Sequence, residues 1–159
     1  MPELTAAKLA STSRVEMTQL VLPSYANSMG NAFGGRVMQW IDLAGAMAAM
    51  RHARMAVVTA SMDQLSFHAP IRVSQIAILQ ARVNAVFGSS MEVEVTVEAE
   101  DPRSGQRTLC CDAFLTFVAL GGEGKPAKAP LLLPATEEEE RRVREAEARR
   151  AERLARRRS

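Results

Sequence analysis

The pattern of hydrophobic and polar positions changes abruptly near residue 34. A polar stretch of asparagines and glycines, residues 27–35, is followed by an apolar run from Val37 to Met50 that only Gln39 and Asp42 interrupt. Such a run predicts a helix buried on most of its sides, from about Gly34 to His52. At 100° per residue, the centre of the apolar face consists of Val37, Ile41, Ala44 and Ala48. Asp42 lies on the flank of that face, beside Met38, Gly45 and Ala49.

Five other segments show the alternation or the short apolar runs that predict β-strands, namely residues 14–22, 56–67, 75–87, 91–100 and 108–120. In the third, we expect one face to contain Ala77, Leu79, Ala81, Val83, Ala85 and Phe87. In the fourth, Met91, Val93, Val95, Val97 and Ala99 point inward, and Glu92, Glu94, Thr96, Glu98 and Glu100 outward. The last segment is apolar on both faces, which predicts an interior strand.

The order of these elements is strand, helix and four strands. The later strands follow one another through short turns, which predicts an antiparallel sheet. Such a sheet needs a cover on one face, and the long apolar helix is the element able to supply it. The sequence therefore predicts an α+β fold in which a curved sheet wraps around one helix.

The remaining segments are expected to lie outside this domain, which we place at residues 14–120. Residues 1–13 are interpreted as a flexible lead and residues 121–134, rich in Gly, Pro and Lys, as a linker. Residues 135–159 are expected to form a charged helical tail that begins with a capping box at Thr136 and Glu139. Its Glu and Arg residues are spaced for i,i+4 pairs. Because valine and leucine are scarce there, we expect only slight packing against the body.

Length and composition fit one domain. The chain has 159 residues, of which 47% are hydrophobic, and a net charge of +2. The tail from Thr136 onward holds nine Arg and seven Glu, so the body is balanced and gives no electrostatic case for nucleic acid. No apolar run approaches the ~20 residues of a membrane span, and no secretory signal is recognisable. Cys110 and Cys111, the only cysteines, point to opposite faces of a strand, and free thiols fit the cytoplasm.

The start of the long helix carries the candidate chemistry. Its first amides have no acceptor within the helix, and the absence of side chains at Gly34 and Gly35 would let a polarised carbonyl oxygen approach them, as in an oxyanion hole. Asp42, two turns further along, would face a water or an acyl carbon held there. The alternatives are a solvated aspartate and a merely flexible helix entry.

At these residues the chain resembles the hotdog-fold acyl-CoA thioesterases of the acyl-CoA hydrolase branch. The resemblance covers roughly residues 14–120, with motifs in the family's order. The matching residues are Asn31, Phe33-Gly34-Gly35, Met38, Asp42, Thr59-Ala60-Ser61-Met62-Asp63, Phe67 with Pro70, Gly88-Ser89-Ser90-Met91 and Ala113-Phe114-Leu115-Thr116-Phe117. One departure lies after Pro70, where the family usually has Gly-Asp and this chain has Ser74-Gln75.

The resemblance implies a hotdog fold and hydrolysis of acyl-CoA to a fatty acid and coenzyme A, without a metal or other cofactor. It makes Asp42 the general base or the nucleophile, Asn31 the amide that holds the water or the thioester, and the Gly35 amide an oxyanion donor. Substrate-binding residues of lower rank are Gly34, Thr59, Asp63, Ser89 and Ser90. The family also implies a homo-oligomer, a dimer with a continuous sheet or a hexamer built as a trimer of dimers, with Asn31 and Asp42 from different subunits.

Several alternatives stay open at this point. Arg54, Arg72 and Arg82 are all candidates for the phosphates of coenzyme A, and the acyl pocket walls are expected from Met29, Phe33, Trp40 and Phe67. A hotdog enoyl-CoA hydratase or dehydratase would need a histidine beside a carboxylate, but His52 is interpreted as a helix-end residue and His68 as a loop residue. An acyl-CoA-sensing regulator would use the arginine-rich tail on nucleic acid.

Overall fold

A computed structural model describes residues 7–157. Its main sheet is antiparallel and has five strands in the order β2-β4-β5-β6-β3. The strands are β2 (Val15–Leu20), β3 (Ala56–Phe67), β4 (Ile76–Phe87), β5 (Ser90–Glu100) and β6 (Arg107–Leu120), and the helices are α1 (Gly34–Ala53) and α2 (Glu137–Arg157). A two-stranded parallel sheet joins β1 (Lys8–Leu9) to β7 (Leu132–Leu133), and two 3-10 turns are η1 (Ala10–Thr12) and η2 (Pro23–Tyr25).

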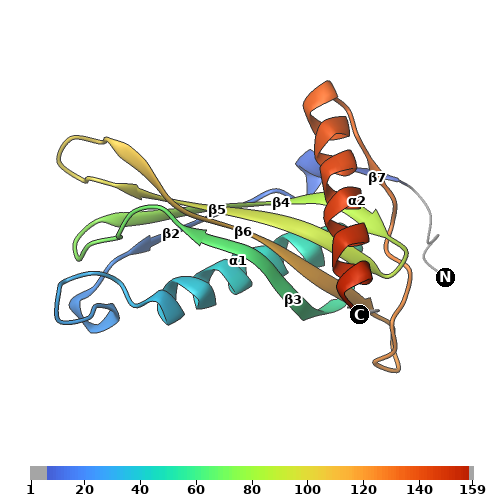
Figure 1. Cartoon of the computed structure of the whole chain (residues 1–159), viewed down its shortest axis with the longest axis horizontal. Helices are drawn as coiled ribbons and strands as arrows, with labels where there is room; N and C mark the ends of the chain where they lie inside the picture. The colour runs from blue at the N-terminus through green and yellow to red at the C-terminus, as the bar shows by residue number, and fades with distance from the viewer. Residues whose placement is uncertain (1–6, 158–159) are drawn as a thin grey trace.

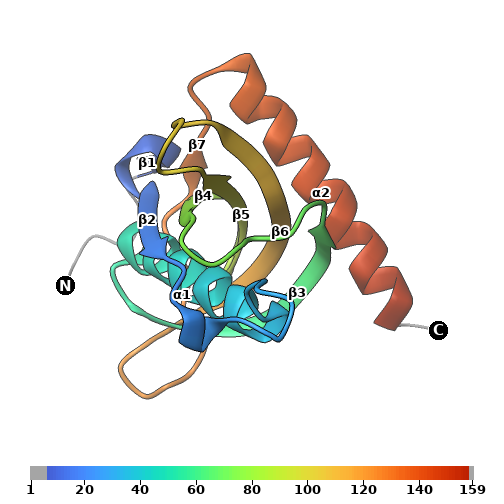
Figure 2. The same ribbon diagram turned by 90° about the vertical axis from the view of Figure 1, so that its left-hand side faces the viewer.

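The main sheet curves around α1, and α2 lies on the opposite side of the sheet (Figures 1 and 2). The expected apolar face of α1 is buried, as are the inward positions of β5. Gly45 of α1 lies so close to the sheet that an added Cβ would stand 3.0 Å from the Phe117 ring of β6. The predicted helix, the five strands and the interior place of the last strand are therefore confirmed.

The predicted alternation of inward and outward side chains along β4 is wrong at the C-terminal end of the strand. It holds as far as Val83, but the register with β5 shifts between Val83 and Ala85, which inserts Asn84 as an extra residue. Ala85 therefore lies opposite Glu92 on the outer face, and Phe87 lies under the guanidinium of Arg150, at 5.0 Å. Both side chains face α2 instead of α1.

The segments expected to be a flexible lead and a linker are fixed to the body in their described parts. Lys8 pairs with Leu132, and its Nζ donates a hydrogen bond of 2.8 Å to the carbonyl oxygen of His52. The His52 ring nitrogen Nε2 lies 2.8 Å from the carbonyl oxygen of Pro130. The expectation of flexibility is thus wrong for residues 8–13, while residues 1–6 lie outside the described part of the chain.

The start of α2 confirms the cap at Thr136, while the reciprocal bond of the expected capping box goes to the residue before it. The Glu139 amide donates to Thr136 Oγ1 at 3.1 Å, and Glu139 Oε2 in return accepts a hydrogen bond of 2.7 Å from the Ala135 amide. Among the expected i,i+4 pairs, Glu138 and Arg142 form an ion pair of 2.8 Å.

The expectation that α2 packs only slightly is wrong, because ion pairs and arginine side chains provide its contacts with the sheet. These contacts pair Arg142 with Glu94, Arg149 with Glu92 at 2.7 Å and Arg153 with Asp63 at 3.4 Å. The Arg149 guanidinium also lies 3.7 Å from the ring centre of Phe114. A hydrophobic pattern does not reveal such an interface.

None of the helices within residues 7–157 is both long enough and apolar enough to span a bilayer.

Candidate active site

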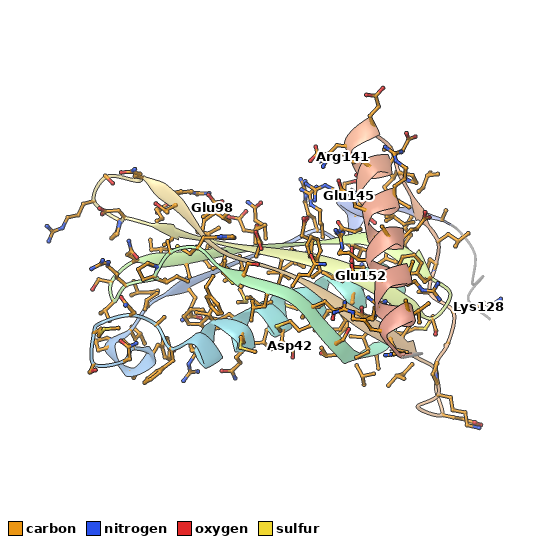
Figure 3. All side chains as sticks on the ribbon, viewed as in Figure 1. Asp42, Glu98, Lys128, Arg141, Glu145 and Glu152 are labelled. Atoms are coloured by element: carbon orange, nitrogen blue, oxygen red, sulfur yellow. The ribbon has the colours of Figure 1, made fainter. Side chains whose placement is uncertain are left out.

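Asp42 and Thr59 come together between α1 and the edge strand β3. Thr59 Oγ1 donates a hydrogen bond of 2.7 Å to Asp42 Oδ1. No other residue in the described chain hydrogen-bonds to this carboxylate, so Oδ2 keeps its lone pairs for a water or a substrate atom. Asp42 is partly exposed, on the α1 side of the sheet (Figure 3). This hydrogen bond makes Thr59 a stronger candidate for the active site than the sequence alone indicates.

The start of α1 offers backbone donors to an external group. Phe33 is the N-cap residue, its side chain makes no cap hydrogen bond, and its carbonyl accepts the amides of Arg36 and Val37. The Gly34 and Gly35 amides precede the first residue that can bond within the helix. A Cβ at Gly35 would meet no atom of this chain within 4 Å, and one at Gly34 would meet only Phe67, at 3.8 Å. Packing within the chain therefore leaves room for a side chain at both glycines. Their lack of a side chain is consistent with the close approach of a substrate or of a second subunit.

Asn27 organises the loop that leads into α1. Its Oδ1 accepts the amides of Met29 at 3.0 Å and Asn31 at 3.1 Å, and its own amide donates to the Asn31 carbonyl at 2.8 Å. This leaves the side-chain Nδ2 as a donor without a protein acceptor in the described chain. Sequence reasoning passed over Asn27, although an asparagine in a polar, glycine-containing stretch before a helix is the signal that marks it.

An open, mostly apolar cavity of about 380 Å³ lies beside the start of α1. Asn31, Gly34 and Phe67 line it, together with His68. The His68 Nε2 atom lies 3.1 Å from Asp112 Oδ2, so this histidine has a carboxylate partner and is more than a simple loop residue. The cavity brings the predicted Asn31 and Gly34 together.

Asp63 does not join Asp42 within this chain. A register shift between Thr59 and Ser61 reverses the alternation of β3, so that Thr59 faces α1 while Asp63 faces α2. Asp63 accepts a hydrogen bond of 3.3 Å from Ser61 Oγ and pairs with Arg153. These contacts give Asp63 a structural explanation that needs no substrate.

The serines of the β4–β5 hairpin lie two strands away from β3. Ser90 is opposite Val118 of β6, and its Oγ donates to the Phe87 carbonyl at 3.3 Å, while the Ser89 carbonyl accepts the Ala119 amide at 2.8 Å. Neither side chain hydrogen-bonds to Asp42 or Thr59 within residues 7–157.

Apolar side chains are exposed around this site, which is the expected setting for an acyl chain or a second subunit. Met29 is 76% exposed, Phe33 52% and Phe67 54%. Trp40 is different, because it is 4% exposed and packs edge-on against Tyr25, at 5.7 Å between ring centres. The interpretation of Trp40 as a pocket wall is therefore wrong.

Other kinds of chemistry find little support in the described residues. No group of three or more His, Cys, Asp or Glu residues within 7–157 is arranged to hold a metal ion. Burial raises the pKa of the Cys111 thiol to about 11, and it also raises the pKa of Cys110. Thiols with raised pKa values are poor nucleophiles at neutral pH.

Comparison with known proteins adds the family. Residues 29–106 match the model of the thioesterase superfamily. An acyl-CoA thioester hydrolase of Bacillus subtilis is 41% identical over 137 residues, which are 86% of this chain and 80% of that protein. The chain belongs to the thioesterase superfamily. It is an acyl-CoA thioester hydrolase of the hotdog fold.

Solved structures of family members agree with this assignment of the fold. A hexameric acyl-CoA thioesterase superimposes with a TM-score of 0.91 at 41% identity, covering 94% of this chain and 96% of that one. The Staphylococcus aureus acyl-CoA hydrolase, solved with butyryl-CoA and coenzyme A, gives 0.89 at 37% identity and covers 96% and 93%. The chain spans only about a quarter of the mouse acyl-CoA thioesterase 11 that it also matches.

Alanine variants of the Staphylococcus enzyme have been made at an aspartate, a threonine and an asparagine. In that protein the threonine follows the aspartate by 17 positions, and the asparagine precedes it by 15.

Proposed function

We propose that this thioesterase hydrolyses acyl-CoA to a free fatty acid and coenzyme A, with Asp42 as the reacting carboxylate. The observation that carries the proposal is the hydrogen bond from Thr59 to Asp42 Oδ1, which orients the carboxylate and leaves Oδ2 free. The same 17-residue spacing separates the aspartate and the threonine changed in the Staphylococcus enzyme. No metal or other cofactor enters this scheme.

The chemistry has two forms. As a general base, Asp42 Oδ2 takes a proton from water while the water oxygen attacks the thioester carbon. As a nucleophile, Oδ2 attacks that carbon itself and gives a mixed anhydride, which water then opens. In both forms the carbonyl oxygen becomes negative and is stabilised by the Gly35 amide, and the thiolate of coenzyme A leaves and takes up a proton.

The asparagine of the site is better assigned to Asn27 than to Asn31. Asn27 lies 15 residues before Asp42, the spacing of the Staphylococcus asparagine. Its Oδ1 holds the loop and its Nδ2 is available as a donor, whereas Asn31 lines the cavity beside Gly34. Asn27→Ala is expected to lower turnover more than Asn31→Ala; equal losses would remove the distinction.

The site is completed by a second copy of the chain in this proposal. β3 is an edge strand of the sheet, and exposed apolar side chains surround the start of α1. A long exposed edge is a pairing surface that soluble proteins cover. Pairing of two β3 strands would give a dimer, and the hexameric relative supports assembly of dimers into a hexamer. A cytoplasmic location is proposed because relatives of this family are named cytosolic.

The decisive experiment is turnover of an acyl-CoA panel with thiol release as the readout. Asp42→Ala should keep its circular dichroism spectrum and oligomeric state and lose about 10²–10⁴-fold in kcat. The matched control is Asp101→Ala, which removes a carboxylate from the exposed β5–β6 turn. Near-normal turnover by Asp42→Ala would refute the mechanism. A single turnover with excess enzyme in ¹⁸O-labelled water tests for the anhydride route. If water opens the anhydride at the Asp42 carbonyl, the label enters the Asp42 carboxylate and the fatty acid receives an unlabelled oxygen from Asp42, whereas general-base attack puts the label in the fatty acid.

The hydratase alternative has one supporting observation, the pair of His68 and Asp112 beside the cavity. Crotonyl-CoA hydration, assayed beside thioester cleavage, tests it directly. The nucleic-acid alternative is weakened at three of the nine arginines of the tail, because Arg142, Arg149 and Arg153 are engaged by carboxylates of the sheet. Salt-dependent retention of the full chain on DNA would revive that alternative.

A further inference from the structure

The outer face of β3 carries an ion pair with α2 that the proposed chemistry does not use. Arg153 Nη1 of α2 lies 3.4 Å from Asp63 Oδ2, and the two side chains are only 15% and 27% exposed. Arg142 and Arg149, nearer the start of α2, pair instead with glutamates of β5. Figure 2 shows the C-terminal part of α2 beside β3. Arg153 therefore attaches the helix to the edge strand.

The backbone of β3 is irregular next to this ion pair. Its register with β6 shifts on both sides of residues 61–63, and Gln64 has a φ of +51°. That left-handed conformation costs energy for a residue with a side chain, so it persists only where surrounding contacts hold it. Because β3 has a strand neighbour on only one side, contacts other than the strand ladder help to hold this segment. The pair of Arg153 and Asp63 is such a contact, one residue away from Gln64.

The same strand orients the reacting carboxylate of the proposed function. Thr59, four residues before Asp63, donates the hydrogen bond of 2.7 Å to Asp42 Oδ1. Hydrogen bonds from a hydroxyl to an oxygen have lengths of about 2.5–3.0 Å, so a displacement of Thr59 by about 1 Å would break this one. Four residues of strand span only about 13 Å, so a movement at Asp63 is carried to Thr59. The position of Asp63 therefore bears on the geometry of Asp42.

We propose that Arg153 is a positioning residue for thioester hydrolysis. It holds Asp63, and with it β3, at the place where Thr59 can orient Asp42. It acts from the α2 side of the sheet, across the strand, and not by contact with the substrate. This inference rests on the proposed role of Asp42. Because Arg153 acts on the reacting group alone, its loss should lower kcat and leave KM nearly unchanged.

The first experiment is steady-state turnover of acyl-CoA by Arg153→Gln. Since misplacement by about 1 Å can cost about 10²-fold, we expect kcat to fall at least about 5-fold while KM changes by less than about 2-fold. Asp63→Asn should give the same loss, and it serves if Arg153→Gln fails to fold. The matched control is Arg150→Gln, an equal loss of charge on α2, where the guanidinium lies over Phe87 of β4 instead of on β3. Turnover by Arg153→Gln and Asp63→Asn that equals the control would overturn the proposal.

A double-variant cycle separates positioning from stability. Thr59→Val removes the hydrogen bond to Asp42 and keeps the shape of the side chain. If Arg153 acts through Thr59, adding Arg153→Gln to Thr59→Val should lower kcat by less than about 2-fold. A merely structural role would reduce the amount of folded enzyme, and with it the apparent kcat, by the same factor with and without Thr59→Val. Equal factors would therefore overturn the positioning role.

Two further readouts keep this proposal apart from the one on Asp42. Arg153→Gln should have the oligomeric state of the unsubstituted chain, and a change of that state would make the ion pair an assembly contact and overturn the positioning role. Normal turnover by Arg153→Gln with lost turnover by Asp42→Ala would overturn the positioning role alone. Normal turnover by Asp42→Ala would instead overturn the function on which this inference rests, and the inference with it.

Discussion

The attachment of α2 to the sheet is tested by replacing Arg149 with methionine, which keeps length and apolar surface but removes the charge. Arg149 donates two hydrogen bonds to Glu92, of 2.7 Å and 2.9 Å, and Glu92 is only 3% exposed. The hydrogen bond to Glu92 is the main cause that raises the pKa of Arg149. After the substitution, the buried carboxylate keeps only the Asn84 side-chain amide as a donor.

The expected cost follows from that burial. Removing one partner of a buried ion pair destabilises a protein by about 3–5 kcal/mol, because the other charge stays buried without compensation. For a chain of this size each kcal/mol lowers Tm by about 2–4 °C, so the expected loss is roughly 6–20 °C. The control is Arg141→Met on the same helix, whose pair with Glu145 is about half exposed on both sides and is worth about 0–1 kcal/mol. Figure 3 shows both members of that pair on α2.

Urea unfolding followed by circular dichroism measures the difference, at one fixed protomer concentration because oligomerisation shifts apparent stability. Adding Glu92→Gln to Arg149→Met should recover part of the loss, since the residual buried group is then neutral. An Arg149→Met variant within about 0.5 kcal/mol of Arg141→Met would refute the reasoning. So would a double variant no more stable than Arg149→Met alone.

Three further predictions concern single residues. Ser74 has a φ of +74°, where glycine is unstrained, so Ser74→Gly should raise the free energy of unfolding by about 0.5–1 kcal/mol, and an unchanged or lower urea midpoint would contradict this. Burial lowers the pKa of His52, so below about pH 6.5 the unfolded chain binds more protons than the folded one. The free energy of unfolding should therefore decrease as the pH is lowered below that value, and it should decrease less steeply in His52→Gln. Gly35→Ala should leave Tm unchanged and reduce kcat/KM, since its Cβ meets no atom of its own chain, and full activity would remove the case for close approach at this amide.

The sequence predicted the elements well because hydrophobic periodicity reports burial. α1 was expected from Gly34 to about His52 and runs to Ala53, and the second strand was expected over the residues that β3 occupies. The period does not report a β-bulge, since one extra residue reverses every later side chain without changing the composition. Hydrophobic alternation therefore predicts the wrong face for Ala85 and Phe87, and it does not reveal that Asp63 faces α2.

The contact between α2 and the outer face of the sheet is not predicted by the hydrophobic pattern either. Glu92 and Glu94 alternate with valines as solvent-facing residues do, and α2 carries few apolar side chains. Their burial depends on arginines about fifty residues later in the chain, whose positions across from β5 are set by the turn at Thr136 and by the short β1–β7 pair. Charge complementarity between distant segments has no local periodic signature.

The bulge in β3 links the two faces of the molecule at the candidate site. It allows one edge strand to present Thr59 to Asp42 on its inner face and, a few residues later, Asp63 to Arg153 on its outer face. A strand with regular alternation would place both side chains on one face and leave either the carboxylate of α1 or the arginine of α2 without its partner. Because β3 has a strand neighbour on only one side, these two contacts help to hold it between the helices, and the geometry of Asp42 depends on a register shift that no catalytic motif contains.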